Sequence, residues 1–230
     1  MSEIVRQHVN FRFFRVLPEW RRLSEAEKDK GRKQFEEVVK RYQSKMIVLS
    51  YSLIGVRAEA EFMLWRISER LEDFNEMSSE LLKTGLGKYI QIPYSYLAVT
   101  KRSMYVDQHQ HEGSESSRAH IVPGNSKYLF VYPFIKQREW YLLSKEERQK
   151  TMDVHIAMGH KYPSIKINTT YSFGIDDQEF VVAFEADSAI DFVDLVMELR
   201  ETQASKYTVR DTPAFTCIKK PIHDVLGDLG

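Results

Sequence analysis

Residues 19–28 read Glu-Trp-Arg-Arg-Leu-Ser-Glu-Ala-Glu-Lys, and residues 139–148 read Glu-Trp-Tyr-Leu-Leu-Ser-Lys-Glu-Glu-Arg. Four residue types recur in the same order, each 120 positions later: Trp20, Leu23, Ser24 and Glu27 return as Trp140, Leu143, Ser144 and Glu147. A second set follows in the same order: Gly55 and Glu61-Phe62 return as Gly174 and Glu179-Phe180. Because chance would not preserve this order, the sequence predicts a duplicated structural unit.

Hydrophobic periodicity and capping boxes predict the same order of elements in both halves. In the first half we expect strands and helices in the order strand 5–16, helix 24–42, strands 46–56 and 60–67, helix 71–84 and strand 94–100. In the second half the order is strand 127–136, helix 144–158, strands 164–173 and 179–186, helix 188–200 and strand 206–218. This is the ferredoxin-like pattern of an α+β fold. We expect two such units to pack sheet to sheet, as a barrel-like, dimeric α+β barrel with its helices outside.

The segment 106–126 separates the two halves. It is rich in Gly, Ser, His and Glu, has few apolar residues and ends in Pro123-Gly124-Asn125. These features are typical of a mobile linker. We therefore divide the chain into a first half at 1–105, a linker at 106–126 and a second half at 127–230.

Composition excludes several classes of partner and site. The 230 residues are 43% hydrophobic, and 33 basic residues balance 33 acidic ones, so no net charge attracts nucleic acid or an anionic membrane. There is no apolar run of about 18 residues, and arginines interrupt the first apolar stretch, so we expect no membrane span and no cleavable leader. Cys217 is the only cysteine, which excludes an intrachain disulfide and a thiolate metal cluster. We expect a cytoplasmic protein, with Cys217 a small buried residue.

The two copies differ in their chemistry. The helix of the second copy carries His155, whereas residues 9–107 contain no histidine. In strand 127–136 one face holds Tyr128, Phe130, Tyr132, Phe134 and Lys136. Tyr132 and Lys136 lie roughly 13 Å apart at about 3.3 Å per residue, so one large planar ligand could contact both. In strand 164–173 the polar face with Asn168 is either solvated or part of a site.

These residues suggest a family. The stretches Tyr132-Pro-Phe-Ile-Lys136, Glu139-Trp140-Tyr141, Met152-Asp-Val-His155 and Gly174-Ile-Asp-Asp177 with Phe180 resemble the chlorite dismutase-like haem proteins, and among these the coproheme decarboxylases. The strong match spans residues 118–215, and the first half matches mainly in pattern. The resemblance implies a duplicated ferredoxin-like unit, assembled as a homopentamer.

The resemblance also implies an activity and a set of site residues. The activity is the peroxide-dependent decarboxylation of iron coproporphyrin III to haem b, with porphyrin and hydrogen peroxide as substrates. His155 matches the ligand of the haem iron, Tyr132 the tyrosine that becomes a radical, and Lys136 the lysine beside the second reactive propionate. Three further residues match haem-contacting positions: Trp140 on the proximal side, and Arg118 and Ser205 at propionates.

Two departures from the family pattern bear on the chemistry. Thirteen residues after the proximal histidine, chlorite dismutases carry an arginine and coproheme decarboxylases glutamine or histidine, whereas this chain has Asn168. Loss of the arginine argues against chlorite chemistry, and the asparagine amide keeps a donor for the oxidant. The second departure is that no residue clearly matches the carboxylate partner of the proximal histidine, which orients the ring and strengthens it as a ligand; Glu201 or Gln203 is near the expected place.

Alternatives remain open from the residues alone. His155 could be a satisfied surface histidine, Trp140 a core residue like Trp20, and Lys136 a solvated strand end. The pair His109-x-His111, with His120 and Glu112, is either a weak divalent-metal site or a solvated loop. In function, the rivals are a haem carrier or sensor without catalysis, a weak haem peroxidase and an assembly protein without haem.

Overall fold

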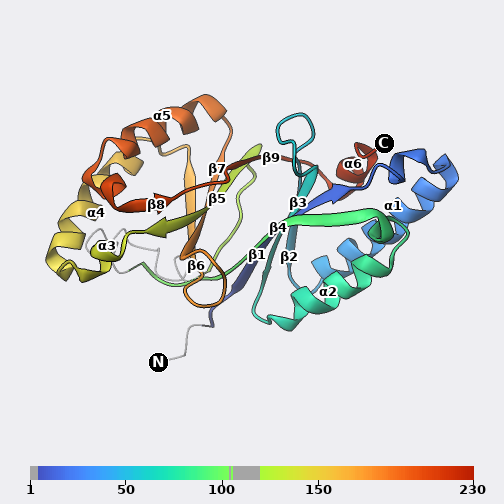
Figure 1. Cartoon of the computed structure of the whole chain (residues 1–230), viewed down its shortest axis with the longest axis horizontal. Coiled ribbons are helices and arrows are strands. Elements are labelled where there is room, and N and C mark those ends of the chain that lie inside the picture. The colour runs from blue at the N-terminus through green and yellow to red at the C-terminus, as the bar shows by residue number, and fades with distance from the viewer. Residues whose placement is uncertain (1–4, 104, 106–119) are drawn as a thin grey trace. The chain divides into compact units, whose positions relative to one another are not determined.

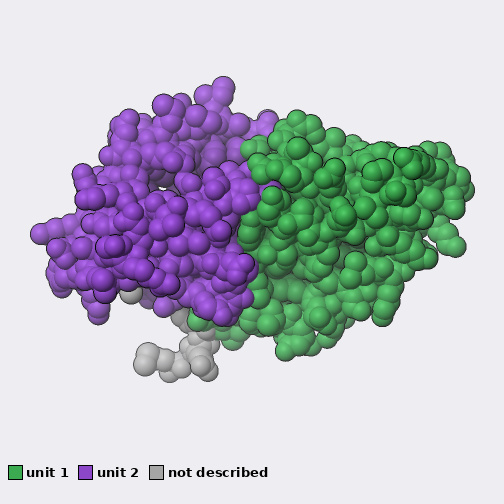
Figure 2. All heavy atoms as spheres, in the orientation of Figure 1, with its two compact units in different colours: residues 1–99, 216–230 green, residues 100–215 purple. Residues whose placement is uncertain are grey.

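The computed structural model of the chain describes residues 5–103, 105 and 120–230 and has an α+β fold (Figure 1). Two compact units compose it, drawn in different colours in Figure 2. Unit 1 comprises residues 1–99 and 216–230, and unit 2 comprises residues 100–215. In the described residues, no helix is both long enough and apolar enough to span a bilayer.

Unit 1 has the predicted order of strands and helices. Its elements are β1 (His8–Val16), α1 (Glu25–Gln43), β2 (Ile47–Ser52), β3 (Phe62–Ser68), α2 (Glu72–Lys83) and β4 (Ile90–Val99), with short 3-10 helices at Trp20–Arg22 and Leu86–Tyr89. The strands lie in the order β4-β1-β3-β2, and each neighbouring pair is antiparallel. This order is that of a ferredoxin-like sheet, as the sequence predicts.

Unit 2 repeats the arrangement. Its elements are β5 (Tyr128–Lys136), α3 (Arg138–Leu142), α4 (Lys145–His160), β6 (Lys166–Tyr171), β7 (Phe180–Ala186), α5 (Ala189–Arg200), a 3-10 helix at Gln203–Tyr207 and β8 (Thr208–Arg210). The strand order β8-β5-β7-β6 matches β4-β1-β3-β2 strand for strand. The predicted duplication is therefore present in the fold. The sheet-to-sheet packing of the two halves stays a prediction.

The recurring residues of the sequence form the framework of both units. Ser24 with Glu27, and Ser144 with Glu147, form capping boxes that begin α1 and α4. Glu61 accepts a hydrogen bond from the backbone N–H of Val16 at 2.7 Å, and Glu179 accepts one from Lys136 at 2.9 Å. In each unit, an equivalent glutamate therefore accepts a hydrogen bond from the last residue of the first strand.

The C-terminal residues depart from the predicted division. The predicted strand 206–218 is two strands, β8 and β9 (Phe215–Lys219), separated by a segment with Pro213, which cannot donate to a sheet. β9 pairs with β2, and α6 (Ile222–Gly227) follows it. Residues 216–230 thus belong to unit 1, whereas the predicted second half, 127–230, included them. The reason is that α6 buries Ile222, Val225 and Leu226 in the core of that unit.

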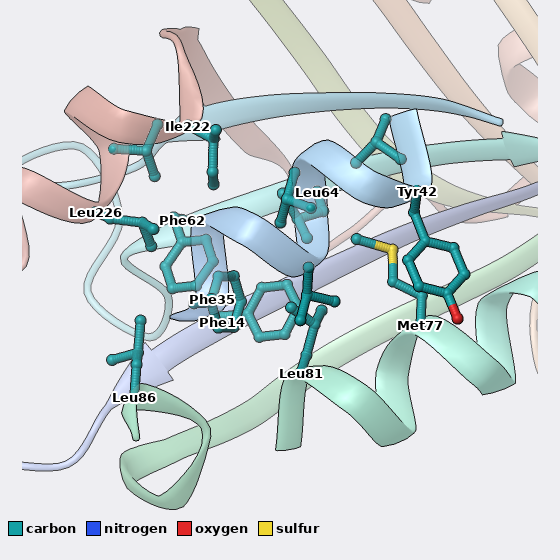
Figure 3. Packing of buried hydrophobic residues seen from close by; sticks show 14 of the residues in the cluster. Phe14, Phe35, Tyr42, Phe62, Leu64, Met77, Leu81, Leu86, Ile222 and Leu226 are labelled. Carbon is teal, nitrogen blue, oxygen red and sulfur yellow. The ribbon is translucent and has the colours of Figure 1, made fainter. Parts of the chain in front are cut away.

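The helices and the sheet of unit 1 enclose a dense core (Figure 3). Phe14 of β1, Phe35 of α1 and Phe62 of β3 pack ring against ring at its centre, with centroids 4.6–6.2 Å apart. Leucine, valine and methionine side chains from α1, α2 and α6 complete it. Such a core is the main source of stability for the unit.

Candidate ligand-binding site between helix and sheet of unit 2

Helix α4 covers its sheet less completely than its counterpart α1. In α1 six residues are buried: Lys28, Gly31, Phe35, Val38, Val39 and Tyr42. In α4 no residue is fully buried. The core cluster between the helices and the sheet of unit 2 consists of Phe130, Ile165, Phe184, Ala186 and Leu195, far fewer residues than in unit 1. The helix–sheet layer of unit 2 therefore buries fewer of its described side chains than that of unit 1.

The rows of paired residues show which face of the sheet α4 and α5 cover. Phe184 of β7 packs against Phe192 of α5, so Phe184 marks the helix-bearing face. Its row runs from Phe130 to Ile167, and the next row on the same face runs from Tyr132 through Val182 to Thr169. Ile167 is 45% exposed and Thr169 is exposed, although both lie on this face. The face is thus open along β6.

His155 lies on the side of α4 that faces this opening. Gly159 follows one turn later, and a Cβ there would lie 3.7 Å from Cδ1 of Ile167 on β6. The Nδ1 atom of His155 is buried and has no hydrogen-bond partner among the residues that the structure describes. In the first copy the equivalent position, 120 residues earlier, is Phe35, whose side chain is fully buried in the core.

The charge state of His155 suits a metal ligand. Burial first, and then the positive charge of Lys136, together lower the pKa of His155 to about 4. The imidazole is therefore neutral near pH 7 and keeps a lone pair on one ring nitrogen. A neutral imidazole with an unpartnered ring nitrogen, on a helix that buries few side chains, has the chemistry of a residue that would bind a porphyrin iron.

Lys136, the last residue of β5, belongs to the same site. Its Nζ lies 4.0 Å from the centroid of the Trp140 ring, within cation–π distance. Burial lowers the pKa of Lys136 to about 8, and the charge of Glu179 opposes this change. The alternative that Lys136 is a solvated strand end does not agree with this burial.

Trp140 is fixed by aromatic neighbours. It is 2% exposed, and its ring lies 5.3 Å from that of Tyr207 and 6.3 Å from that of Tyr105. Trp20 of the first copy is buried in the same way. The tryptophan is thus a buried framework residue in both units. In unit 2 its ring also contacts the ammonium group of Lys136.

Tyr132 lies on the helix-bearing face, in the middle of β5. Its ring stacks on Phe184 with centroids 5.7 Å apart. Burial raises the pKa of Tyr132, the charge of Asp211 raises it further, and the charge of Arg200 opposes this. The phenol therefore keeps its hydrogen throughout the physiological pH range, beside the ion pair that Arg200 forms with Asp211 at 2.6 Å.

Asn168 does not join these residues. It pairs with Ala183, which pairs with Val131, and this row lies on the face opposite Tyr132 because successive residues of a strand alternate. Its side chain is buried there and donates a hydrogen bond to Glu185 at 2.9 Å. The position of Asn168 thus does not support its predicted contact with the oxidant, nor a solvated polar face. Ile167, Thr169 and Tyr171 are the residues of β6 on the helix-bearing face.

The remaining predicted residues are only partly placed near His155. The Ser205 hydroxyl lies 2.7 Å from the carbonyl oxygen of Arg200 and 2.8 Å from that of Thr202, so it holds the turn after α5. Glu201 and Gln203 are exposed, and neither bonds His155 in the part of the chain that the structure describes. Arg118, His109, His111 and Glu112 lie outside the described residues. His120 belongs to no metal-binding cluster of the described residues.

Arg148 is a candidate site residue that the sequence analysis did not identify. It lies seven residues before His155 on the same side of α4, and its Nε is buried without a hydrogen-bond partner among the described residues. In the first copy the equivalent Lys28 forms an ion pair with Glu25 at 2.5 Å, but the position of Glu25 is Lys145 in α4. A comparison of the two copies at the spacing of 120 could have revealed this unpaired cation. Cys217 is fully buried, as predicted.

Comparisons with known proteins agree with this fold. A family model described as chlorite dismutase matches residues 28–220. A coproheme decarboxylase of Mycolicibacterium smegmatis is 31% identical over 201 residues, which cover 83% of this chain and 81% of that protein. A mutant chlorite dismutase from Candidatus Nitrospira defluvii superposes with a TM-score of 0.88 at 24% identity, covering 97% of this chain and 95% of that one. The imidazole complex of that enzyme gives 0.87 at 24% identity, with coverage of 97% and 94%.

Proposed function

The chain belongs to the chlorite dismutase family, and from this premise we propose that it decarboxylates iron coproporphyrin III to haem b at the expense of hydrogen peroxide. The family binds haem and contains haem-dependent oxidoreductases, and the relative with 31% identity is a coproheme decarboxylase. One observation carries the proposal: His155 is neutral and lacks a partner for its buried Nδ1, beside a helix that leaves its sheet open.

His155 would bind the porphyrin iron from the α4 side. Lys136 and Arg148 would offer positive charge to the carboxylates at the porphyrin edge, and the ring of Trp140 holds the Lys136 ammonium in place. The bound iron supplies the redox chemistry with peroxide, while the protein supplies placement and electrostatics.

Tyr132 has the properties of the group that oxidises the substrate side chain. Conversion of a propionate to a vinyl group releases carbon dioxide, one proton and two electrons, and peroxide is the electron acceptor. The buried phenol of Tyr132 keeps its hydrogen at neutral pH, so it can give up that hydrogen atom and then take one from the propionate carbon. Lys136 would hold the carboxylate by its positive charge.

Chlorite chemistry is less well supported. No residue of β6 is an arginine, and the residues of this strand on the helix-bearing face are Ile167, Thr169 and Tyr171. A cation that holds an anionic oxidant over the iron is therefore missing from the strand position at which the family resemblance places it.

The proposal is tested with purified protein, iron coproporphyrin III and hydrogen peroxide, by following the product mass. With the wild-type protein, we expect the porphyrin to lose two molecules of carbon dioxide. The Tyr132→Phe protein should bind the porphyrin without decarboxylating it. Tyr128→Phe removes a hydroxyl from the same face of the same strand and should stay active. A wild type that releases no carbon dioxide refutes the function, and an active Tyr132→Phe refutes the role of that tyrosine.

A further inference from the structure

In unit 1 an arginine neutralises the glutamate at the end of the first strand. One oxygen of Glu61 accepts a hydrogen bond from the backbone N–H of Val16 at 2.7 Å, and the other forms an ion pair with Arg21. The side chain of Arg21 is 45% exposed, whereas Val16 is apolar and buried in the core. The carboxylate of Glu61 therefore has its cation at the surface and none at the end of the strand.

In unit 2 the cation next to the equivalent glutamate has changed place. Tyr141 stands 120 positions after Arg21, and Lys136 stands 120 positions after Val16. Both donors to Glu179 are neutral: they are the backbone N–H of Lys136 at 2.9 Å and the hydroxyl of Tyr141 at 2.5 Å. The described residues provide no ion-pair partner for this carboxylate. The positive charge has thus moved from the surface to the end of the strand.

The Lys136 ammonium is near Glu179 but is not joined to it. Its Nζ lies 4.0 Å from the centroid of the Trp140 ring, and in the part of the chain that the structure describes it forms no ion pair. A direct ion pair would occupy donors of the ammonium group. Because it lies over the ring instead, the ammonium keeps its donors for the carboxylate of a ligand.

The other groups around Lys136 do not supply a negative charge. Trp140 of α3 contacts it with a neutral ring, and β8 pairs with it through an uncharged threonine. His155 of α4 is neutral near pH 7. Burial, and then the hydrogen bond to Glu179, raise the pKa of the Tyr141 phenol, which is neutral as well. Among the described residues, Glu179 is thus the acidic group whose charge opposes the effect of burial on Lys136.

We propose that Glu179 is a positioning residue of the porphyrin site, which holds the Lys136 ammonium charged and in place for a carboxylate of the substrate. This role rests on the proposed function, because the ligand of Lys136 is taken to be a porphyrin carboxylate. Glu179 acts in two ways: it fixes the backbone from which the Lys136 side chain extends, and its unpaired negative charge favours the ammonium over the amine. Glu61 has only the first of these roles, since Arg21 neutralises it.

The pKa of Lys136 in the porphyrin-free protein tests this role. Trace acetic anhydride modifies only neutral amines, so the labelling rate across pH, followed by mass spectrometry, gives the pKa of Lys136, with the exposed Lys127 as internal reference. We expect a midpoint of about 8 for the wild type. Glu179→Gln keeps an acceptor for both hydrogen bonds but loses the charge, so its midpoint should be about one pH unit lower. An unchanged midpoint in Glu179→Gln would overturn the proposal.

Three further variants separate the charge from the framework. Glu61→Gln makes the same change in the first copy and should leave the midpoint of Lys136 as it is. Tyr141→Phe removes a hydrogen bond from Glu179 but keeps its charge, so the midpoint should not fall. Tyr141→Arg restores the ion pair of the first copy and should lower the midpoint as Glu179→Gln does. A fall in Glu61→Gln, or equal midpoints in Tyr141→Phe and Tyr141→Arg, contradicts the role of Glu179.

The affinity for iron coproporphyrin III connects this charge to the ligand. At pH 6 Lys136 is charged in both proteins, so the wild type and Glu179→Gln should bind equally. As the pH rises from 7 to 9, Glu179→Gln should become weaker by up to about tenfold, the limit set by a fall of one pH unit. A deficit that is the same at every pH would indicate a structural role alone and refute the proposal. The labelling needs neither porphyrin nor turnover, so a wild type that releases no carbon dioxide refutes the proposed function without deciding the role of Glu179.

Discussion

At the residue scale, the position shared by Phe35 and His155 separates the two copies. Both residues lie eleven positions after the serine that caps their helix, on the side that faces the sheet. Phe35 is fully buried and fits between Phe14 and Phe62, so it closes the layer in unit 1. His155 brings a polar ring with an unsatisfied nitrogen to the same place. The same position is thus a core position in unit 1 and a position with an unpartnered polar side chain in unit 2.

The pKa of His155 predicts how the porphyrin-free protein responds to acid. The pKa is about 4 in the folded state and about 6.5 in the unfolded state, so the unfolded state binds the proton more readily. Stability is therefore complete above about pH 6.5 and falls as the pH drops toward 4. Between pH 7 and pH 4.5 we expect a loss of about 2–3 kcal/mol from this group, since one pKa unit is about 1.4 kcal/mol.

Urea unfolding at the two pH values measures this loss. His155→Phe introduces the residue that the first copy has at this position, and its side chain cannot be protonated. The change in its free energy of unfolding between the two pH values should therefore be smaller than that of the wild type by about 2–3 kcal/mol. Other acidic and basic groups titrate equally in both proteins. An identical pH dependence of the two proteins would show that the pKa of His155 is not lowered in the folded state.

At the element scale, α1 and α4 begin alike and pack differently. Both start with a serine–glutamate capping box, yet α1 buries six residues and α4 buries none. Helical stability in proteins comes mainly from packing of the apolar side, so α4 relies on something other than its own side chains. A porphyrin seated between α4 and the sheet would supply that packing.

Hydrogen exchange should show this dependence directly. Without porphyrin, we expect the amides of α4 to exchange faster than those of α1, because segments with few buried contacts open locally at low cost. Iron coproporphyrin III at about 100 times its Kd adds up to about 2.7 kcal/mol, which slows exchange by up to about a hundredfold. Peptides from 145–160 and 25–43 are compared by mass spectrometry, with α1 as the internal control. Equal rates in α1 and α4, or no slowing in α4, would contradict the account.

The order of strands and helices could be predicted because hydrophobic periodicity and capping boxes are local signals. The face of β6 that the helix covers could not be predicted from the sequence. Alternation alone separates Ile167 and Thr169 from Asn168, but the helix that covers one of the two faces is a tertiary feature. Counting thirteen residues from His155 therefore selected Asn168, whose side chain lies on the other face.

At the scale of the whole molecule, the chain is a duplication whose copies have diverged in packing. Unit 1 closes its layer with aromatic rings and receives α6 from the end of the chain. The apolar spacing of Ile222, Val225 and Leu226 fits a helix, but no local signal says which unit it contacts, so the sequence could not place it. The homopentamer that the family resemblance implies, and the packing of one sheet on the other, stay predictions.

Because α6 packs in the core of unit 1 and the candidate site lies in unit 2, we expect α6 to stabilise the fold without affecting the candidate site. Leu226→Ala should lower the free energy of unfolding by about 2–5 kcal/mol, the usual cost of emptying a core leucine position. Leu71→Ala, at a partly exposed position of the same unit, should cost less than about 1 kcal/mol. Porphyrin affinity at a temperature where all three proteins are folded should be the same. A weaker affinity of Leu226→Ala alone would show that the two units are coupled.

The most direct test of the account is an absorption titration of the porphyrin-free protein with iron coproporphyrin III. The wild type and His160→Ala, which changes an exposed histidine of the same helix, should bind with the same affinity and give the spectrum of imidazole-ligated iron. His155→Ala should lose that spectrum and at least about tenfold in affinity, or about 1.4 kcal/mol. If His155→Ala binds as tightly as the wild type and gives the same spectrum, His155 is not the iron ligand and the account is wrong.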